Sequence, residues 1–263
     1  TGHGVLREPN SILSYASLAC IAIQANQNEM HGGQSVPNFD YSMAPGVAKT
    51  FEKKYWEYFS TYLEALLAIP DTNTEILTNE LRAKLPKITM STSDEFKALL
   101  INCKFSVPHI PEYEVSLCHE FAYRKALKKA DKETYQAMEA LVHNLNTMNS
   151  RAGAQVPFSS LNYGTDTSPE GRMAIKNLLM ATDAGLGNGE TPIFPVQIFK
   201  VKEGVNYNPD DINYDLFKLA IKVSAKRLFP NFSFLDAPFN LQYYKKGDPN
   251  TEVAYMGCRT RVM

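Results

Sequence analysis

The chain has 263 residues, of which 44% are hydrophobic and 21% are charged, and its formal net charge is −1. This length predicts one large domain or two small ones, and the composition excludes disordered, collagen-like and coiled-coil proteins. The balanced charge gives no basic field for holding DNA, and no apolar run approaches the roughly 20 residues that span a bilayer. We therefore expect neither DNA nor a membrane as a partner.

Helix signals dominate the first part of the chain. Asn10 and Ser11 are candidate N-caps of a helix over residues 10–29. A loop is predicted over residues 31–40, and a second helix is expected to begin after Pro45. Its apolar stripe has spacings of three and four residues and consists of Val47, Phe51, Tyr55, Phe59, Tyr62 and Leu66.

Three more helices are predicted before residue 150. They cover residues 73–84, 92–102 and about 114–148. The last of them carries a basic run that is typical of a solvated helix face. We therefore predict a mainly helical region over residues 1–150.

After residue 150, short apolar runs alternate with amphipathic segments. Ser168 and Pro169 predict the start of a helix that runs to about residue 183, because they supply an N-cap and a first-turn proline. The predicted strands cover residues 154–161, 192–201 and 232–235, with a last extended stretch over 253–262. Strands separated by helices imply a parallel sheet with both faces covered, or a barrel.

One more helix is predicted between the second and third of these strands, over residues 211–228. The residues that we expect to face inward from it are Leu216, Phe217, Ala220, Ile221, Val223 and Leu228. The domain prediction is therefore a helical region over 1–150 and an α/β region over 151–263.

Two motifs that suggest chemistry fail on their context. The glycines at 185, 187 and 189 follow a predicted helix and precede a strand, which is the reverse of a dinucleotide-binding turn, so we interpret them as a helix C-cap and loop. Cys118 and His119 are neighbours on one helix and point about 100° apart, so they are not a nucleophile–base pair.

The cysteines give information about the setting of the protein. Cys20, Cys103, Cys118 and Cys258 are scattered and form no C-x-x-C pair, which argues against a disulfide framework or a cysteine-rich zinc site and favours a reducing, cytoplasmic environment. The chain starts at Thr1 and stops within a predicted strand. We therefore expect a fragment of a longer protein, truncated at both ends.

Cys258 lies in a distinctive segment. If residues 253–262 are extended, Met256, Cys258 and Thr260 share one face, and Gly257 lets another group approach the backbone beside the sulfur. From composition alone, a structural cysteine remains the more common interpretation.

Five segments of the chain together resemble the class III, anaerobic ribonucleoside-triphosphate reductases. These segments are residues 31–40, 162–166, 185–195, 229–238 and 255–262. The resemblance runs over essentially the whole chain. It implies a helical dimer and effector region followed by half of a ten-stranded α/β barrel of the glycyl-radical type, which ends in the loop that presents the cysteine.

The resemblance also implies a chemistry. Cys258 matches the residue that becomes a thiyl radical, takes the 3′ hydrogen of the ribose and lets the 2′ hydroxyl leave as water. Such a sulfur needs shielding from solvent rather than a lowered pKa. Met256 resembles the methionine of members that use formate as reductant, and the alternative interpretation of this residue is core packing.

The implied partners extend beyond this chain. They are a ribonucleoside triphosphate, a deoxynucleotide or ATP effector bound at a homodimer interface, formate and a radical-SAM activating enzyme. The glycyl radical and a zinc site are expected in parts of the protein outside this chain, so the isolated fragment should be inactive. Glu8, Ser11 and Lys54 resemble the effector region, and their alternative interpretation is a capped helix start and a solvated lysine.

Two other functions remain open from the sequence. The chain could be a nucleotide-binding and dimerising module without chemistry, or part of another glycyl-radical enzyme with an acyl or carbon-skeleton substrate. The second of these would require a different cysteine-loop sequence from that of residues 256–261.

Overall fold

The structure is a computed structural model that describes residues 7–30, 32–103, 110–149, 155–257 and 260–262. It contains two compact units, one made of Thr1–Val47 with Glu133–Met263 and the other of Ala48–Lys132. The boundaries of these units differ from the predicted boundary at residue 150. They fall inside two long helices, each of which begins in one unit and ends in the other. The predicted regions 1–150 and 151–263 were defined by function and stay a prediction.

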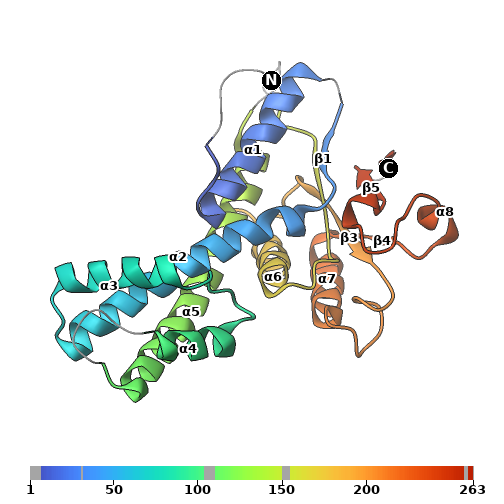
Figure 1. Ribbon diagram of the computed structural model, residues 1–263. Coiled ribbons are helices and arrows are strands. Elements are labelled where there is room, and N and C mark those ends of the chain that lie inside the picture. Colours follow the sequence, from blue (N-terminus) through green and yellow to red (C-terminus); the bar gives the residue numbers. More distant parts are fainter. Residues whose placement is uncertain (1–6, 31, 104–109, 150–154, 258–259, 263) are drawn as a thin grey trace. The chain divides into compact units, whose positions relative to one another are not determined.

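The unit Ala48–Lys132 is helical. It contains α3 (Asp71–Lys84) and α4 (Ser93–Asn102), with parts of α2 (Phe39–Leu67) and α5 (Glu112–Thr147) (Figure 1). All of these helices were predicted. The apolar stripe of α2 is buried as expected from Val47 to Tyr62, whereas Leu66 is 63% exposed.

The other unit is built on a parallel sheet. Its strands are β1 (Gln34–Val36), β2 (Ser159–Tyr163), β3 (Val196–Val201) and β4 (Asn231–Phe234), and they lie in this order with every pair parallel. This confirms the predicted parallel α/β arrangement. The four described strands form an open sheet with edges at β1 and β4, and the ten-stranded barrel stays a prediction.

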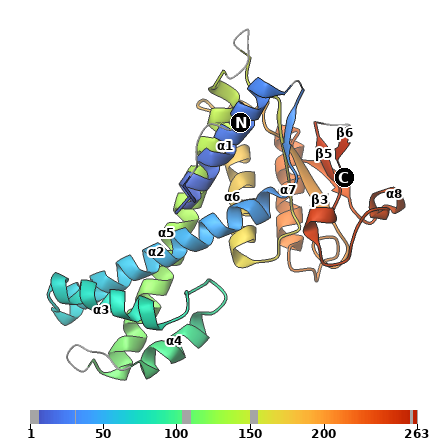
Figure 2. The same ribbon diagram turned by 45° about the horizontal axis from the view of Figure 1, so that its top comes forward.

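Helices α6 (Pro169–Ala184) and α7 (Tyr214–Arg227) cover one face of this sheet (Figure 2). Phe199 of β3 stacks against Phe217 of α7, at 6.0 Å between ring centroids, and Gln197 donates to Thr182 of α6 at 2.7 Å. Alternate residues of a strand point to opposite faces of the sheet. Gln197 and Phe199 therefore both belong to the face that the helices cover.

The opposite face carries a more polar set of residues. It holds Ser35, Ser160, Asn162, Ile198, Lys200, Asn231 and Ser233, which the strand register places side by side. A hairpin of β5 (Ala254–Met256) and β6 (Thr260–Val262) lies over this face, with the short helix α8 (Pro238–Leu241) nearby (Figure 2).

Local signals predicted the helix starts well. Ser11 caps α1 (Ile12–Glu29) and Ser168 caps α6, where its hydroxyl accepts from the Gly171 N–H at 3.0 Å. Gly185 ends α6 with φ +82, as expected for a C-cap glycine. No helix of the described residues is both long and apolar enough to cross a bilayer.

Three predictions about local structure were wrong. The predicted loop 31–40 contains β1 and the start of α2, because pairing with β2 makes an extended strand from three residues without an apolar pattern. Pro45 lies inside α2 rather than before it. The other strands were found, but β2 begins at Ser159 and β3 at Val196, later than expected.

The last extended stretch, residues 253–262, was also predicted wrongly. It is two antiparallel strands, with Met256 opposite Thr260 and Ala254 opposite Val262, and not one continuous strand. Gly257 has φ +61, a backbone conformation that favours glycine and ends β5.

The inward face of α7 differs from expectation at two positions. Ile221 is 47% exposed and Leu228 is 80% exposed. Leu228 follows the helix in the left-handed conformation, with φ 65, so its side chain leaves the buried stripe. Leu216, Ala220 and Val223 are buried as predicted.

Candidate active site

The β5 strand is fixed to the polar face of the sheet through its backbone. The Tyr255 carbonyl accepts from Ser35 Oγ at 2.8 Å and from Asn162 Nδ2 at 2.9 Å, while the Tyr255 N–H donates to Asn162 Oδ1 at 2.8 Å. The Gly257 N–H donates to Ser160 Oγ at 2.8 Å. These hydrogen bonds reach the backbone of residues 255–257 and do not depend on their side chains. They therefore fix the position of this segment on β1 and β2.

Met256 lies half-buried against the segment that precedes β1. Its Sδ occupies the space where a Cβ of Gly33 would stand, so only glycine fits at position 33 without a shift of the methionine. This contact explains one of the two glycines of the His31–Asp40 segment. Cys258, the predicted thiyl residue, lies outside the described residues.

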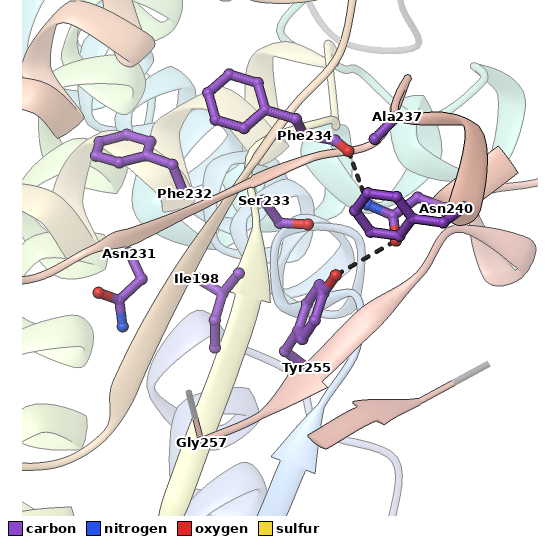
Figure 3. Close-up of a pocket in the computed structure, with 10 residues that line it drawn as sticks. Ile198, Asn231, Phe232, Ser233, Phe234, Ala237, Asn240, Tyr255 and Gly257 are labelled. Carbon is purple, nitrogen blue, oxygen red and sulfur yellow. Dashed lines mark hydrogen bonds between the residues drawn. The ribbon is translucent and has the colours of Figure 1, made fainter. Parts of the chain in front are cut away.

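A cavity of about 600 Å³ opens beside this hairpin (Figure 3). Its walls come from β3, β4, α8 and β5, and they include Ile198, Asn231, Ser233, Asn240 and Tyr255. Gly257, the residue before the predicted thiyl position, also lines it. None of the described lining residues is charged.

Two of the polar groups in this cavity bond to each other. The Tyr255 hydroxyl donates to Asn240 Oδ1 at 3.3 Å, and Asn240 Nδ2 donates to the Phe234 carbonyl at 2.8 Å (Figure 3). They connect the hairpin to the short helix after β4. The cavity therefore has a fixed polar wall on the side of Tyr255.

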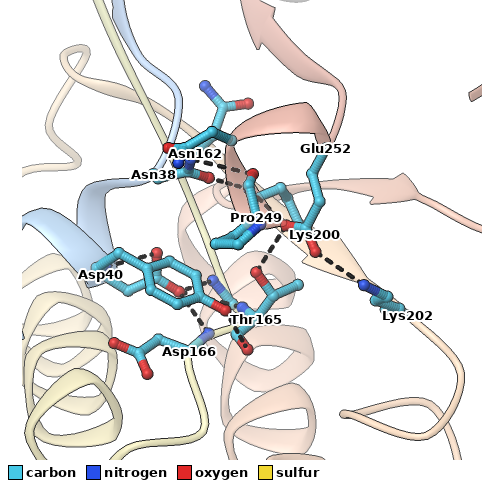
Figure 4. A network of polar contacts seen from close by, with 12 residues as sticks. Asn38, Asp40, Asn162, Thr165, Asp166, Lys200, Lys202, Pro249 and Glu252 are labelled. Carbon is cyan, nitrogen blue, oxygen red and sulfur yellow. Dashed lines mark hydrogen bonds and ion pairs between the residues drawn. The ribbon is translucent and has the colours of Figure 1, made fainter. Parts of the chain in front are cut away.

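A buried charged cluster lies at the base of the hairpin (Figure 4). Glu252, two residues before β5, pairs with Lys200 at 3.0 Å and with Lys202 at 2.9 Å, and also accepts from Thr165 Oγ1 at 2.9 Å. Lys200 further donates to Asn38 Oδ1 at 2.6 Å. The Lys200 side chain is fully buried and that of Glu252 is 3% exposed.

The ion pairs decide the protonation of this cluster. Burial alone would raise the pKa of Glu252, but its pairs with Lys200 and Lys202 outweigh burial and lower that pKa. For Lys202, burial acts to lower the pKa, and its bonds to Tyr244 and Glu252 raise it overall. Glu252 and Lys202 are therefore charged at neutral pH, and Glu252 ties the start of β5 to the sheet.

Asp40, at the start of α2, holds the turn that follows β2. Its Oδ2 accepts from the backbone N–H groups of Gly164, Thr165 and Asp166 at 2.8 to 3.1 Å (Figure 4). Gly164 has φ +128, and a Cβ there would stand 2.9 Å from the Lys200 carbonyl. The Asn162–Asp166 motif is thus explained by a tight, carboxylate-bound turn beside the charged cluster.

The three predicted effector residues occupy different settings. Glu8 is exposed and lines a cavity of about 480 Å³ along the first turns of α1, together with Arg7 and Asn10. Ser11 uses its hydroxyl to cap α1 by accepting from the Ser14 N–H at 3.3 Å. Lys54 belongs to the other compact unit and pairs with Glu57 at 2.8 Å. Their role in effector binding stays a prediction.

Two of the remaining cysteines lie in the core, and Cys103, at the end of α4, is half-buried. Cys20 and Cys118 are buried, and burial raises the pKa of Cys20 to about 11 and that of Cys118 further. His119 is held by Tyr55 at 2.9 Å and by Ser93 at 3.1 Å, so it bonds to neighbours other than Cys118. Cys118 and His119 thus bond to different neighbours, as expected for adjacent positions on one helix. No group of acidic, histidine and cysteine residues in the described part is arranged to hold a metal ion.

Comparison with known proteins identifies the family to which this chain belongs. The family model of anaerobic ribonucleoside-triphosphate reductase matches residues 1–263. The chain belongs to this family. Anaerobic ribonucleoside-triphosphate reductases are oxidoreductases, and the resemblance seen in the sequence motifs is therefore confirmed.

Individual relatives match shorter stretches of this reductase-family chain. The anaerobic ribonucleoside-triphosphate reductase of Enterobacteria phage T4 is 38% identical over 140 residues, which are 53% of this chain and 22% of the phage protein. The Haemophilus influenzae enzyme is 34% identical over 139 residues, or 52% and 18% of the two chains. The Escherichia coli enzyme is 37% identical over 101 residues, or 38% and 14%. The aligned parts thus span less than a quarter of these relatives.

Sequence reasoning on this anaerobic reductase chain missed the residues that hold the hairpin. Ser35, Ser160 and Asn162 carry it, but a polar residue in a strand gives no sign of what lies over it. Lys200 gave a clearer signal, because a lysine inside an apolar strand needs a buried partner. That partner, Glu252, is distant in sequence.

Proposed function

We propose that this chain is a portion of the catalytic subunit of an anaerobic ribonucleoside-triphosphate reductase, in which Cys258 carries a thiyl radical. The family match over residues 1–263 supports this, and so does the anchoring of residues 255–257 at the rim of the 600 Å³ cavity. The anchoring carries the proposal most directly, because radical transfer needs a cysteine held at a fixed place beside its substrate.

The proposed reaction removes the 2′ hydroxyl of a ribonucleoside triphosphate. The Cys258 thiyl takes the 3′ hydrogen atom, and the 2′ hydroxyl then leaves as water. Formate supplies two electrons and becomes carbon dioxide, so a ribonucleotide, formate and a proton give a deoxyribonucleotide, carbon dioxide and water. A glycyl radical outside this chain, made by a radical-SAM activating enzyme, would supply the unpaired electron.

Residues of this chain would position and shield the reacting groups. Ser35, Ser160 and Asn162 hold the backbone before Cys258, and the uncharged cavity provides a place for the nucleoside. Met256, held against Gly33, would stand beside the sulfur on the side where formate reacts. Keeping water away protects a reactive intermediate from side reactions.

Control of the reaction is the remaining part of the proposal. A deoxynucleotide or ATP effector would bind near Glu8, Ser11 and Lys54 in a homodimer of the full-length protein. The exposed Glu8 and the neighbouring cavity along α1 are compatible with such a contact. The proposed location of the protein is the cytoplasm, and zinc is expected in a part outside this chain.

Replacing Cys258 with Ser in the full-length protein tests the proposal. The variant should form the glycyl radical, detected by electron paramagnetic resonance, and yield no deoxyribonucleotide from CTP and formate. Product formation by this variant would refute the role of Cys258. A protein that binds nucleotide but forms no product even with the natural Cys258 would favour the non-catalytic module.

A further inference from the structure

Ser233 carries a buried hydroxyl that has no hydrogen-bond partner among the described residues. The residue is 6% exposed, and its Oγ is shielded from solvent. A buried hydroxyl without a partner costs stability, commonly about 1–3 kcal/mol, so such a group in a folded protein calls for an explanation.

The position of Ser233 points to a ligand. It lies on the polar face of the sheet, beside Lys200 in the strand register, and lines the 600 Å³ cavity (Figure 3). Gly257, next to the predicted thiyl residue, lines the same cavity. Ser233 thus borders a space that is large enough for part of a nucleotide.

The surroundings of Ser233 restrict the chemistry of that ligand. The described lining residues are uncharged, with Asn231, Asn240 and Tyr255 supplying the other polar groups. A triphosphate would need lysine or arginine side chains or a cluster of backbone N–H groups. The lining therefore fits the neutral part of a nucleotide, its ribose or its base.

We propose that Ser233 binds the nucleoside part of the substrate through a hydrogen bond from its hydroxyl to a ribose hydroxyl or to a polar edge of the base. This inference rests on the proposed function, because it takes the cavity beside Cys258 as the place of the substrate. It adds a substrate-binding residue on β4 to the backbone anchors on β1 and β2.

The test is a binding measurement in the full-length protein. CTP and GTP binding is compared between a Cys258→Ser variant, which prevents turnover, and the same protein with Ser233→Ala added. We expect the dissociation constants to rise about 3- to 10-fold, the effect of one neutral hydrogen bond. The thermal midpoint should not fall, because Ser233 loses no bond to a described residue.

Ser159→Ala is the matched control. Ser159 also carries a buried hydroxyl without a partner among the described residues, but it belongs to the helix-covered face of the sheet and does not line the cavity. This variant should bind both nucleotides as its parent does. An equal rise for CTP and GTP indicates a ribose contact, and an unequal rise indicates a base contact.

Unchanged affinity for both nucleotides in the Ser233→Ala variant would overturn the inference. So would an equal loss of affinity in the Ser159→Ala control, because the effect would then be general. These outcomes are separate from a failure of the proposed function, which is detected by product formation in the Cys258→Ser variant alone.

Discussion

Replacing Glu252 with Gln tests whether buried charge fixes the base of the β5–β6 hairpin. The substitution keeps the size of the side chain and removes its charge, which leaves Lys200 and Lys202 without this counter-ion. Lys200 is the more affected, because its side chain is 0% exposed, whereas that of Lys202 is 20% exposed. Breaking a buried ion pair by removing one partner costs about 3–5 kcal/mol.

This loss of stability should be largest in the segment around Glu252. In hydrogen exchange of the full-length protein, the amides of residues 250–257 should exchange about 140- to 3,700-fold faster in the variant, which is this free energy converted at tenfold per about 1.4 kcal/mol. Glu203→Gln is the control, since Glu203 is an exposed acid that directly follows Lys202 in the chain, and its replacement should leave exchange unchanged. Equal protection of residues 250–257 in the Glu252→Gln variant and the parent would refute this reasoning.

The remaining predictions concern pH and packing. The pKa of Glu252 is lowered from 4.5, so its ionised form stabilises the fold at pH values above 4.5. This contribution should be lost as the pH falls below that value, and hydrogen exchange of residues 250–257 should follow the loss. Gly33→Ala should destabilise the hairpin by about 1 kcal/mol and lower turnover of the full-length protein, since its Cβ displaces the flexible Met256 side chain and stands 3.3 Å from the Phe158 carbonyl oxygen, whereas Gly187→Ala, with open space around it, should do neither. Burial, then Lys97, lowers the pKa of His119 to about 4, so thermal stability should fall as pH drops from 6.5 toward 4, and His119→Gln should flatten that slope. A slope that is the same in the parent and the His119→Gln variant would contradict this assignment.

The sequence predicted those features that depend on neighbouring residues. The Ser168 cap, the Gly185 C-cap and the buried stripe of α2 follow from local spacing, and the structure has all of them. Strand β1 was missed because its three residues are extended only through pairing with β2. The hairpin was missed because residues 253–262 alternate like one strand, whereas β5 ends at Gly257, whose φ is +61.

The candidate site was predictable in part for the same reason. Met256 and the segment around Cys258 were identified by resemblance, which needs no knowledge of three-dimensional contacts. The roles of Ser160, Glu252 and Ser233 depend on which segments meet across the sheet. The spacing of Phe232 and Phe234 predicts only that Ser233 faces away from them, and the cavity in front of it becomes visible only in the folded chain.

A structure of the full-length protein with CTP bound would test whether this cavity holds the substrate beside Cys258. We expect the ribose to lie in the cavity lined by Ser233 and Tyr255, with its C3′ about 3.5 Å from the sulfur of Cys258, within the range in which a hydrogen atom can be transferred. A ribose bound outside this cavity, or a Cys258 sulfur that faces away from it, would refute this role of the cavity.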